Sequence, residues 1–319
     1  NTAQALGEIA RKIRVKPKRF NFAGTKDRNA ISTQLVSAFA VVPKRLLGLK
    51  LTDLKIGGAW LASTKIGLGD LTGNRFTITL TSENCGVDVC SGRIKRRVED
   101  LNFLVANFFG QQRFGSLRKN TAQVGKLILK GNFEGAVLNY LCFVDASAKS
   151  ERETGAIDAR CRLEKERDFT KALEYFPGHL KYEQVLLRHL SDNSNDFVGA
   201  LRKLPRSVLL LFVHAFQSLL FNEFLYSKLE CRDEKEEANI IGFESVLSQE
   251  EELLLEKHGV AKESFKVKGI PEISSKGAKR RLFVKLSDFE ILQEKPLLLR
   301  FSLPSGSYAT VALDQLLSS

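Results

Sequence analysis

The apolar positions of this chain recur with helical spacing near its start and with strand spacing further on. In residues 2–13 every third or fourth position is apolar, which predicts a helix that Thr2 can cap. Residues 75–80 alternate between polar and apolar side chains, as in a half-buried strand. Residues 297–303 predict another strand, which returns the chain to a helix starting near Tyr308.

Apolar residues recur at regular spacing in two more stretches of the chain. Residues 31–35 alternate and predict a strand that follows a glycine turn. Residues 92–105 predict a helix that delivers Asn107 and Phe109 onto the loop beyond its end. The apolar positions at helical spacing in that stretch are Ile94, Val98, Leu101 and Val105.

Between about residues 116 and 282 the pattern changes to longer helical segments. The longest apolar stretch, residues 208–220, predicts a buried helix, and no run approaches eighteen apolar residues without a charge, so we expect no membrane span. Short strands with interposed helices favour an α+β fold over a doubly wound parallel sheet. A chain of 319 residues, 43% of them apolar, can bury a sizeable core in about two domains.

The net charge of the chain restricts the classes of partner that it could bind. There are 49 basic and 37 acidic residues, for a net charge of +12, which favours a polyanion such as nucleic acid or an acidic membrane surface. Basic residues concentrate at 11–19, 93–97 and 276–281 and predict a path for phosphates. The five cysteines show no ligand spacing and the four histidines are scattered, so we expect no metal site and reduced thiols in a cytoplasmic protein.

The most informative stretch for chemistry is residues 21–34, where Asp27 stands between Lys26 and Arg28 shortly after Gly24. Flanking cations favour the ionised form of a carboxylate. An ionised carboxylate suits a nucleophile or an electrostatic stabiliser better than a general acid. For this triplet alone, the competing interpretation is a solvated surface turn.

Two motifs together resemble the TruD family of RNA pseudouridine synthases, and the segment at residues 213–218 is more similar to its archaeal and eukaryotic branch. The positions that match the signature around the family's catalytic aspartate are Ala23, Gly24, Lys26, Asp27, Arg28, Ala30 and Gln34. The positions that match a second motif are Asn107, Phe109, Gly110, Gln112, Arg113, Phe114 and Gly115. Weaker matches follow in the family's order at residues 68–76, 213–218 and 303–310.

The resemblance implies a fold and a division into domains. It implies a pseudouridine synthase catalytic core with a curved, mostly antiparallel sheet, built from residues 1–132 and 283–319. Residues 133–282 would form an inserted α/β TRUD domain. Methionine is absent and the chain begins with Asn1, so we expect that dropped methionines and an N-terminal segment are missing from the printed sequence.

The activity implied by the resemblance is isomerisation of uridine to pseudouridine in tRNA, at position 13. The reaction breaks the bond from C1′ to N1, turns the base and joins C1′ to C5, so it needs neither cofactor nor metal. By resemblance Asp27 is the catalytic residue. It would attack C1′ or assist elimination to a glycal, and both routes stay open. We expect a monomer in the cytoplasm, or in the nucleus if the source is eukaryotic.

The resemblance also implies a substrate-binding set, which we expect to meet at the Asp27 cleft. Its members are Asn107, Phe109, Tyr308, Lys26 and Arg28. Aromatic rings and an amide suit a base that leaves its stack and rotates. On composition alone Phe109 would be a core residue, because the chain has 22 phenylalanines.

Three neighbouring residues stay outside this set. Arg113 could hold a phosphate or lock the Asp27 loop, Phe114 suits packing, and His214 lies in an apolar run typical of a core histidine. An alternative function is a non-catalytic RNA-binding or RNA-folding protein with the same basic cleft, although the Asp27 triplet argues against it. A nuclease would need clustered carboxylates for metal ions, and the sequence has no such cluster.

Overall fold

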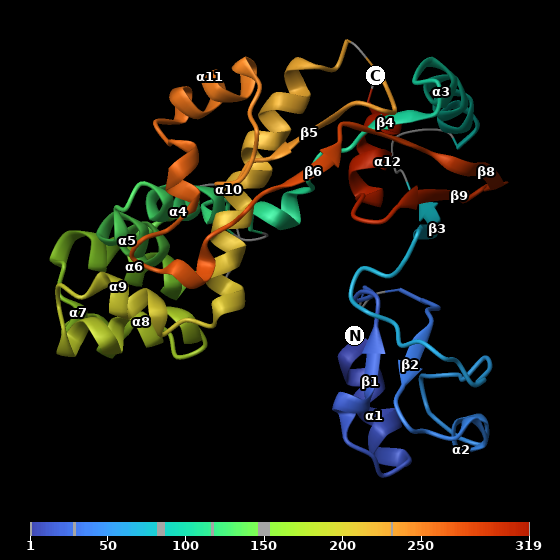
Figure 1. Cartoon of the computed structure of the whole chain (residues 1–319), viewed down its shortest axis with the longest axis horizontal. Coiled ribbons are helices and arrows are strands. Elements are labelled where there is room, and N and C mark those ends of the chain that lie inside the picture. Colours follow the sequence, from blue (N-terminus) through green and yellow to red (C-terminus); the bar gives the residue numbers. More distant parts are fainter. Residues whose placement is uncertain are drawn as a thin grey trace. The chain divides into compact units, whose positions relative to one another are not determined.

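The computed structural model describes residues 2–27, 30–81, 87–115, 118–145, 154–230 and 232–318. Contacts within the chain divide it into two units, which Figure 1 colours by sequence. The first unit consists of Asn1–Asn74 with Pro304–Gly306, and the second of Arg75–Leu303 with Ser307–Ser319. Each unit has its own buried core and is described by itself.

The first unit packs one helix against a two-stranded antiparallel sheet. Its elements are α1 (Thr2–Lys12), the 3-10 helix η1 (Pro17–Arg19), β1 (Phe20–Phe22), β2 (Val36–Ala38) and α2 (Pro43–Leu47). Strand β1 pairs with β2 so that Phe20 faces Ala38. The apolar face predicted for α1 is confirmed, because Leu6, Ile9 and Ala10 are buried in this unit's core.

The strand predicted at residues 31–35 is wrong. The chain forms no strand there, and β2 begins only at Val36. Ile31 is fully exposed and Leu35 is 63% exposed. Alternation predicts a strand only where one face has a core to cover, and these side chains have none.

The second unit begins with a three-stranded sheet covered by two helices. The sheet has the order β3-β9-β8. Its elements are β3 (Gly73–Leu80), β8 (Ser287–Glu294), β9 (Leu297–Pro304), α3 (Val87–Asp100) and α12 (Ala309–Leu317). Every second residue of β9 is buried, and α3 and α12 pack on the same core. The predicted strands at 75–80 and 297–303 and the helix after Tyr308 are confirmed.

The helix expected at residues 92–105 differs from the one observed. Helix α3 starts earlier, at Val87, and ends at Asp100, while Val105 lies in the strand β4 (Leu104–Ala106). Asn102 and Phe103 have positive φ angles of 48° and 57°, so the chain reverses there before the strand. Val105 is still buried in the core that Ile94 and Val98 enter, which is why the apolar spacing continued past the helix.

A body of helices fills the middle of the second unit. Its helices are α4 (Thr121–Leu129), α5 (Phe133–Cys142), α6 (Thr154–Glu166), α7 (Phe169–Tyr175), α8 (Lys181–Asp192), α9 (Phe197–Arg202), α10 (Arg206–Ser227) and α11 (Gln249–His258). Short 3-10 helices follow as η4 (Lys262–Phe265) and η5 (Pro271–Ile273). They share one large apolar core, which begins with α4, ahead of the predicted domain boundary at residue 133. That boundary stays a prediction.

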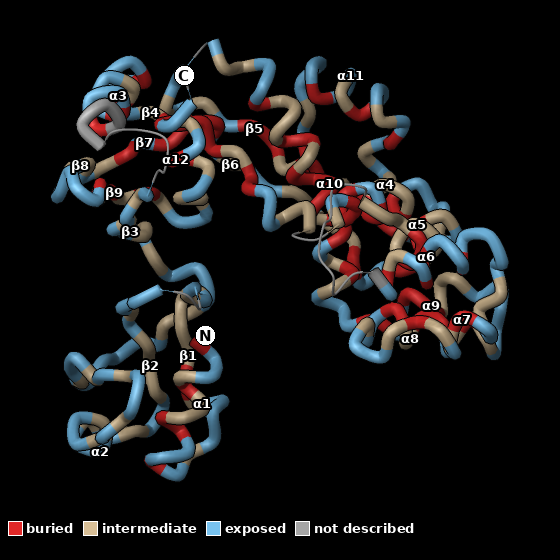
Figure 2. The backbone as a smooth tube through the Cα atoms, turned by 180° about the vertical axis from the view of Figure 1, so that it is seen from behind, coloured by how far each residue is buried: buried red, intermediate tan, exposed pale blue. Residues whose placement is uncertain are grey.

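Helix α10 runs through this body with most of its apolar side chains buried (Figure 2). The buried helix predicted at residues 208–220 is therefore confirmed. Among the described residues, α10 is the one helix whose length and composition would suffice to cross a membrane. Here its buried side chains contact other helices, with α4 as a principal partner.

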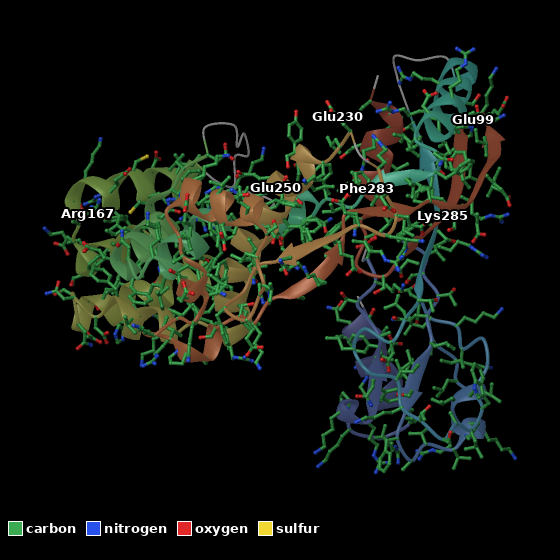
Figure 3. The ribbon with its side chains drawn as sticks, turned by 45° about the horizontal axis from the view of Figure 1, so that its top comes forward. Glu99, Arg167, Glu230, Glu250, Phe283 and Lys285 are labelled. Carbon is green, nitrogen blue, oxygen red and sulfur yellow. The ribbon has the colours of Figure 1, made fainter. Side chains whose placement is uncertain are left out.

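One extended segment joins the helical body to the sheet. Strand β6 (Ala278–Arg281) pairs antiparallel with β5 (Glu237–Ile240), and after Leu282 the strand β7 (Phe283–Lys285) pairs antiparallel with β4. Figure 3 labels Phe283, which is fully buried, and Lys285, which is exposed. A small apolar core beneath this junction contains Phe109, Phe221 and Phe283.

Candidate active site

The Asp27 loop follows β1 in the first unit, and the start of α1 anchors it. The backbone N–H of Lys26 donates to Thr2 Oγ1 at 2.9 Å, and Gln34 Nε2 donates to the same oxygen at 3.0 Å. The Thr2 hydroxyl, predicted as a helix cap, is thus an acceptor for two residues of the aspartate motif. One oxygen thus joins Lys26 and Gln34, which lie on either side of Asp27 in the sequence.

A second contact comes from the weaker motif at residues 68–76. Ala23 O accepts a hydrogen bond from the N–H of Gly69 at 2.7 Å. Lys26 Nζ donates to Asn74 Oδ1 at 2.6 Å. The two motif segments of the first unit therefore lie side by side, although 48 positions separate Lys26 from Asn74 in the sequence.

Asp27 is exposed, while Lys26 is half-buried. The ammonium group of Lys26 donates to Asn74 Oδ1 within the first unit. Arg28, the other predicted partner, lies outside the described residues. Asp27 is thus a solvent-accessible carboxylate beside a lysine whose ammonium group is bonded to Asn74.

The remaining members of the predicted set lie in the second unit, where Asn107 continues the edge of β4. Its N–H donates to Leu282 O at 2.8 Å, and its Nδ2 donates to Arg281 O at 3.0 Å. Asn107 is only 6% exposed. Its amide group therefore extends the β4–β7 pairing by one residue through a side chain.

Arg280 completes this arrangement from β6. Its Nη2 donates to Asn107 Oδ1 at 2.6 Å and to Asn107 O at 2.9 Å, and its Nε reaches the same carbonyl at 3.2 Å. The guanidinium carbon lies 4.2 Å from the centre of the Phe109 ring, a cation–π geometry. Burial lowers the pKa of Arg280 to about 10; Tyr308 opposes the shift and Arg113 adds to it. Arg280 remains a cation at neutral pH.

Phe109 is held by its backbone as well as by its ring. Asn222 of α10 accepts from the Phe109 N–H at 2.8 Å and donates to the Phe109 carbonyl at 3.0 Å. The ring is 7% exposed and meets Phe221 edge-on at a centroid distance of 5.5 Å. The core role weighed for Phe109 is thus present in this conformation.

Tyr308, the residue before α12, packs beside Phe109. The two ring centroids are 6.2 Å apart, and Tyr308 is half-buried. A Cβ atom at Gly110 would lie 3.0 Å from Tyr308 Cδ1, so glycine allows this close approach. The structure therefore brings together Asn107, Phe109 and Tyr308, whose meeting point with Asp27 stays a prediction.

Arg113 also lies near Phe109 and belongs to the 3-10 helix η2 (Gln111–Phe114). Its guanidinium carbon is 5.4 Å from the centre of the Phe109 ring, and among the described residues its buried Nε has no hydrogen-bond partner. Burial, aided by the Arg113 cation, lowers the pKa of the half-buried His214, which favours the neutral imidazole. Gly115 ends η2 with a φ of 103°, and a Cβ there would lie 2.2 Å from Arg118 O.

Sequence patterns missed two residues of this site. Arg280 was grouped with the basic surface at residues 276–281, yet its side chain turns onto Phe109. Asn222 carried no signal, because its partner lies 113 positions earlier in the sequence. Among the residues that the structure describes, no group of three His, Cys, Asp or Glu side chains could hold a metal ion.

Comparison with known proteins covers nearly the whole chain. The sequence profile of the family described as tRNA pseudouridine synthase D (TruD) matches residues 1–246 and 237–316. A protein of Methanopyrus kandleri described as "Probable tRNA pseudouridine synthase D" is 33% identical over 100% of this chain and 83% of its own length. A protein of Methanococcus maripaludis with the same description is 32% identical over 98% of this chain and 80% of its own length.

The fold agrees as well. A crystal structure from Methanosarcina mazei, described as "Putative tRNA pseudouridine synthase D (TruD)", matches with a TM-score of 0.81 and 28% identity. The match covers 99% of this chain and 85% of the other. The expected α+β fold with antiparallel strands is thereby confirmed.

Proposed function

Since this chain belongs to the tRNA pseudouridine synthase D (TruD) family, we propose that it converts a uridine of tRNA, at position 13, into pseudouridine. The single observation that carries the proposal beyond the family is the exposed carboxylate of Asp27 on its anchored loop. Such a group is accessible to the sugar of a bound nucleotide, and among the described residues it forms no ion pair that would first have to break.

In the proposed reaction the bond from C1′ to N1 of the target uridine breaks, while Asp27 either attacks C1′ or assists elimination to a glycal. On the first route the bond between Asp27 and C1′ breaks again when C5 bonds to C1′. The base turns, C5 bonds to C1′, C5 loses its proton and N1 gains one, so substrate and product are isomers. Direct attack and elimination to a glycal both use the same ionised carboxylate. Neither route consumes an oxidant or an energy source, so we propose no cofactor.

The second-unit residues supply the base-binding part of the proposal. Tyr308 is half-buried and offers a ring surface to an unstacked base. Phe109 and Asn107 are nearly buried, so we propose that they line the pocket mainly by holding Tyr308 and Arg280 in place. Lys26 and Arg28 would contact the RNA beside Asp27.

The proposal is tested by mapping pseudouridine in a tRNA transcript after incubation with the protein. Wild type should modify uridine 13, and a transcript with cytidine at that position should remain unmodified. Asp27→Asn should abolish the product while RNA affinity stays within about twofold, because the amide keeps the shape but not the charge. Asp53→Asn, a change at another exposed aspartate of the first unit, is the matched control and should retain activity. Turnover by the Asp27 variant near the wild-type rate would refute the assignment.

A further inference from the structure

A side chain of α12 bonds both backbone groups of Ala106 in β4. Ala106 is 1% exposed, so its N–H and C=O groups need partners within the protein. The Ala106 N–H donates to Gln315 Oε1 at 2.8 Å, and Gln315 Nε2 donates to Ala106 O at 2.9 Å. In an antiparallel sheet a paired residue makes the same exchange, accepting from one N–H and donating to the C=O of the same residue. Gln315 thus takes the place of a neighbouring strand at one residue.

Gln315 is itself held within the second unit. Its Nε2 also donates to Val311 O, one turn earlier in α12, at 3.1 Å. The backbone carbonyl of Gln315 accepts from Arg97 Nε of α3 at 3.1 Å. An amide suits this position, because it combines an acceptor for the Ala106 N–H with donors for the two carbonyls. The orientation of the amide is therefore set by its bonds to β4 and to its own helix.

The same face of α12 carries Tyr308, a member of the proposed base site. Tyr308 precedes the helix and lies about two helical turns before Gln315, so the two side chains project from one side of α12. At the Tyr308 end this face meets Gly110, where a Cβ atom would lie 3.0 Å from Tyr308 Cδ1 and 3.5 Å from Val311 Cγ2. At the other end it meets Ala106 through Gln315. Helix α12 is thus fixed at two points along the segment 106–110.

The packing between α12 and β4 connects these two points. A cavity lined by residues of both elements, among them Val105 and Ala312, has a volume of about 10 Å³, the size of one water molecule. Leu313 is buried in the sheet core and helps to hold α12 there, but apolar packing is not directional. The two hydrogen bonds to Ala106 add a defined register. Because close-packed interiors transmit strain, a shift of α12 along β4 displaces Tyr308.

We propose that Gln315 is a positioning residue of the base site, which sets the distance between the rings of Tyr308 and Phe109 through its hydrogen bonds to Ala106. Asn222 of α10 holds Phe109, so amides from two helices position the two rings. The inference rests on the proposed function for the identity of the base. A base that turns beside Tyr308 needs that ring at a defined place, so an error in the distance slows turnover. Binding of the tRNA depends on many phosphate contacts and is affected less.

The first test separates kcat from KM for pseudouridine formation in a tRNA transcript. Gln315→Met keeps the length of the side chain but removes the amide, and it should lower kcat per folded molecule about 10- to 100-fold while KM changes less than about threefold. Gln315→Glu keeps an acceptor for the Ala106 N–H and should recover part of the loss. Leu187→Ala, at a fully buried position of the helical body, is the control for lost stability. It should lower the urea midpoint of unfolding and leave kcat per folded molecule unchanged.

The second test observes the Tyr308 ring without using activity. The chain has five tyrosines, which are replaced by 3-fluorotyrosine, and Tyr308→Phe identifies the Tyr308 signal in the fluorine NMR spectrum. Gln315→Met should move the Tyr308 signal by more than its linewidth, because the ring changes its place beside Phe109. Gln315→Glu should move it less. In Leu187→Ala the Tyr308 signal should stay where it is in wild type.

The outcomes separate this inference from the proposed function. In an active enzyme, a lower kcat without a moved Tyr308 signal, or a moved signal without a lower kcat, would overturn the proposal. Wild-type behaviour of Gln315→Met in both measurements would overturn it as well. If wild type forms no pseudouridine but the signal moves as expected, the proposed function fails and the positioning of the Tyr308 ring stands. Should Gln315→Met not fold, the same two measurements on Gln315→Glu decide, with smaller changes in the same direction expected.

Discussion

Asn222 is the residue whose removal tests most directly how the Phe109 segment is held. Its amide bonds both backbone groups of Phe109, at 2.8 Å and 3.0 Å, across 113 positions of sequence. Asn222→Ala removes both partners at once. Asn222→Asp keeps an acceptor for the Phe109 N–H but turns a negative oxygen toward the Phe109 carbonyl.

The size of the effect follows from these two bonds. A buried polar group left without a partner costs about 1–3 kcal/mol, and partial access of water to this part-buried site keeps each cost near the lower end. We therefore expect Asn222→Ala to lower the free energy of unfolding by about 2–4 kcal/mol. Asn222→Asp should cost a similar amount, because repulsion replaces one of the lost bonds.

Two measurements test this prediction. Urea unfolding gives the change in the free energy of unfolding, and hydrogen exchange of the peptide covering residues 107–115 gives the local stability. A loss of about 2 kcal/mol in local stability corresponds to about 30-fold faster exchange. Tyr226→Ala, which removes a 73% exposed side chain from the same helix, is the control and should change stability by less than about 0.5 kcal/mol. Exchange in Asn222→Ala at the wild-type rate would show that the two Asn222 hydrogen bonds do not hold the Phe109 segment.

Two more predictions concern the helical body. Glu183 is 5% exposed and pairs with Arg160 at 2.8 Å and with Arg118 at 3.0 Å, so Glu183→Gln should cost about 3–5 kcal/mol in urea unfolding by leaving buried cations uncompensated. A loss no larger than that of Glu166→Gln, on an exposed pair, would contradict this. Burial raises the pKa of the Cys142 thiol from 9.0 to about 11, so its contribution to stability is complete below pH 9 and disappears as pH rises through 11. At pH 8 iodoacetamide should therefore label the exposed Cys161 well before Cys142, and equal labelling of the two in peptide mass spectra would count against the burial.

Local sequence patterns correctly predicted the elements whose apolar residues all fall on one face, with the spacing of a helix or a strand. The apolar face of α1, the alternation of β3 and the start of α12 after Tyr308 appear where the sequence placed them. Short motifs also located the Asp27 loop and the Asn107 segment, because a tight turn or a close ring contact restricts the residue at a given position. Gly110 and Gly115 are such positions.

Apolar periodicity gave wrong predictions at positions whose burial or exposure depends on distant parts of the chain. Residues 31–35 alternate but have no core to cover, while Val105 kept helical spacing after the helix had ended. Whether a side chain is buried depends on where the tertiary structure places its backbone. The spacing of apolar residues around it indicates only the local secondary structure. Both errors have this cause.

The sequence alone therefore determined the family and the α+β class, and it gave the segments that we propose carry the chemistry. Only the tertiary structure shows that the Arg280 guanidinium lies over the Phe109 ring and does not belong to the basic surface of residues 276–281. It also shows that Asn222 accepts a hydrogen bond from the backbone N–H of Phe109. The physical reason is distance along the chain: hydrogen bonds and ring contacts that join residues more than a hundred positions apart leave no local pattern. They exist only once β6, η2 and α10 have been packed around the same ring.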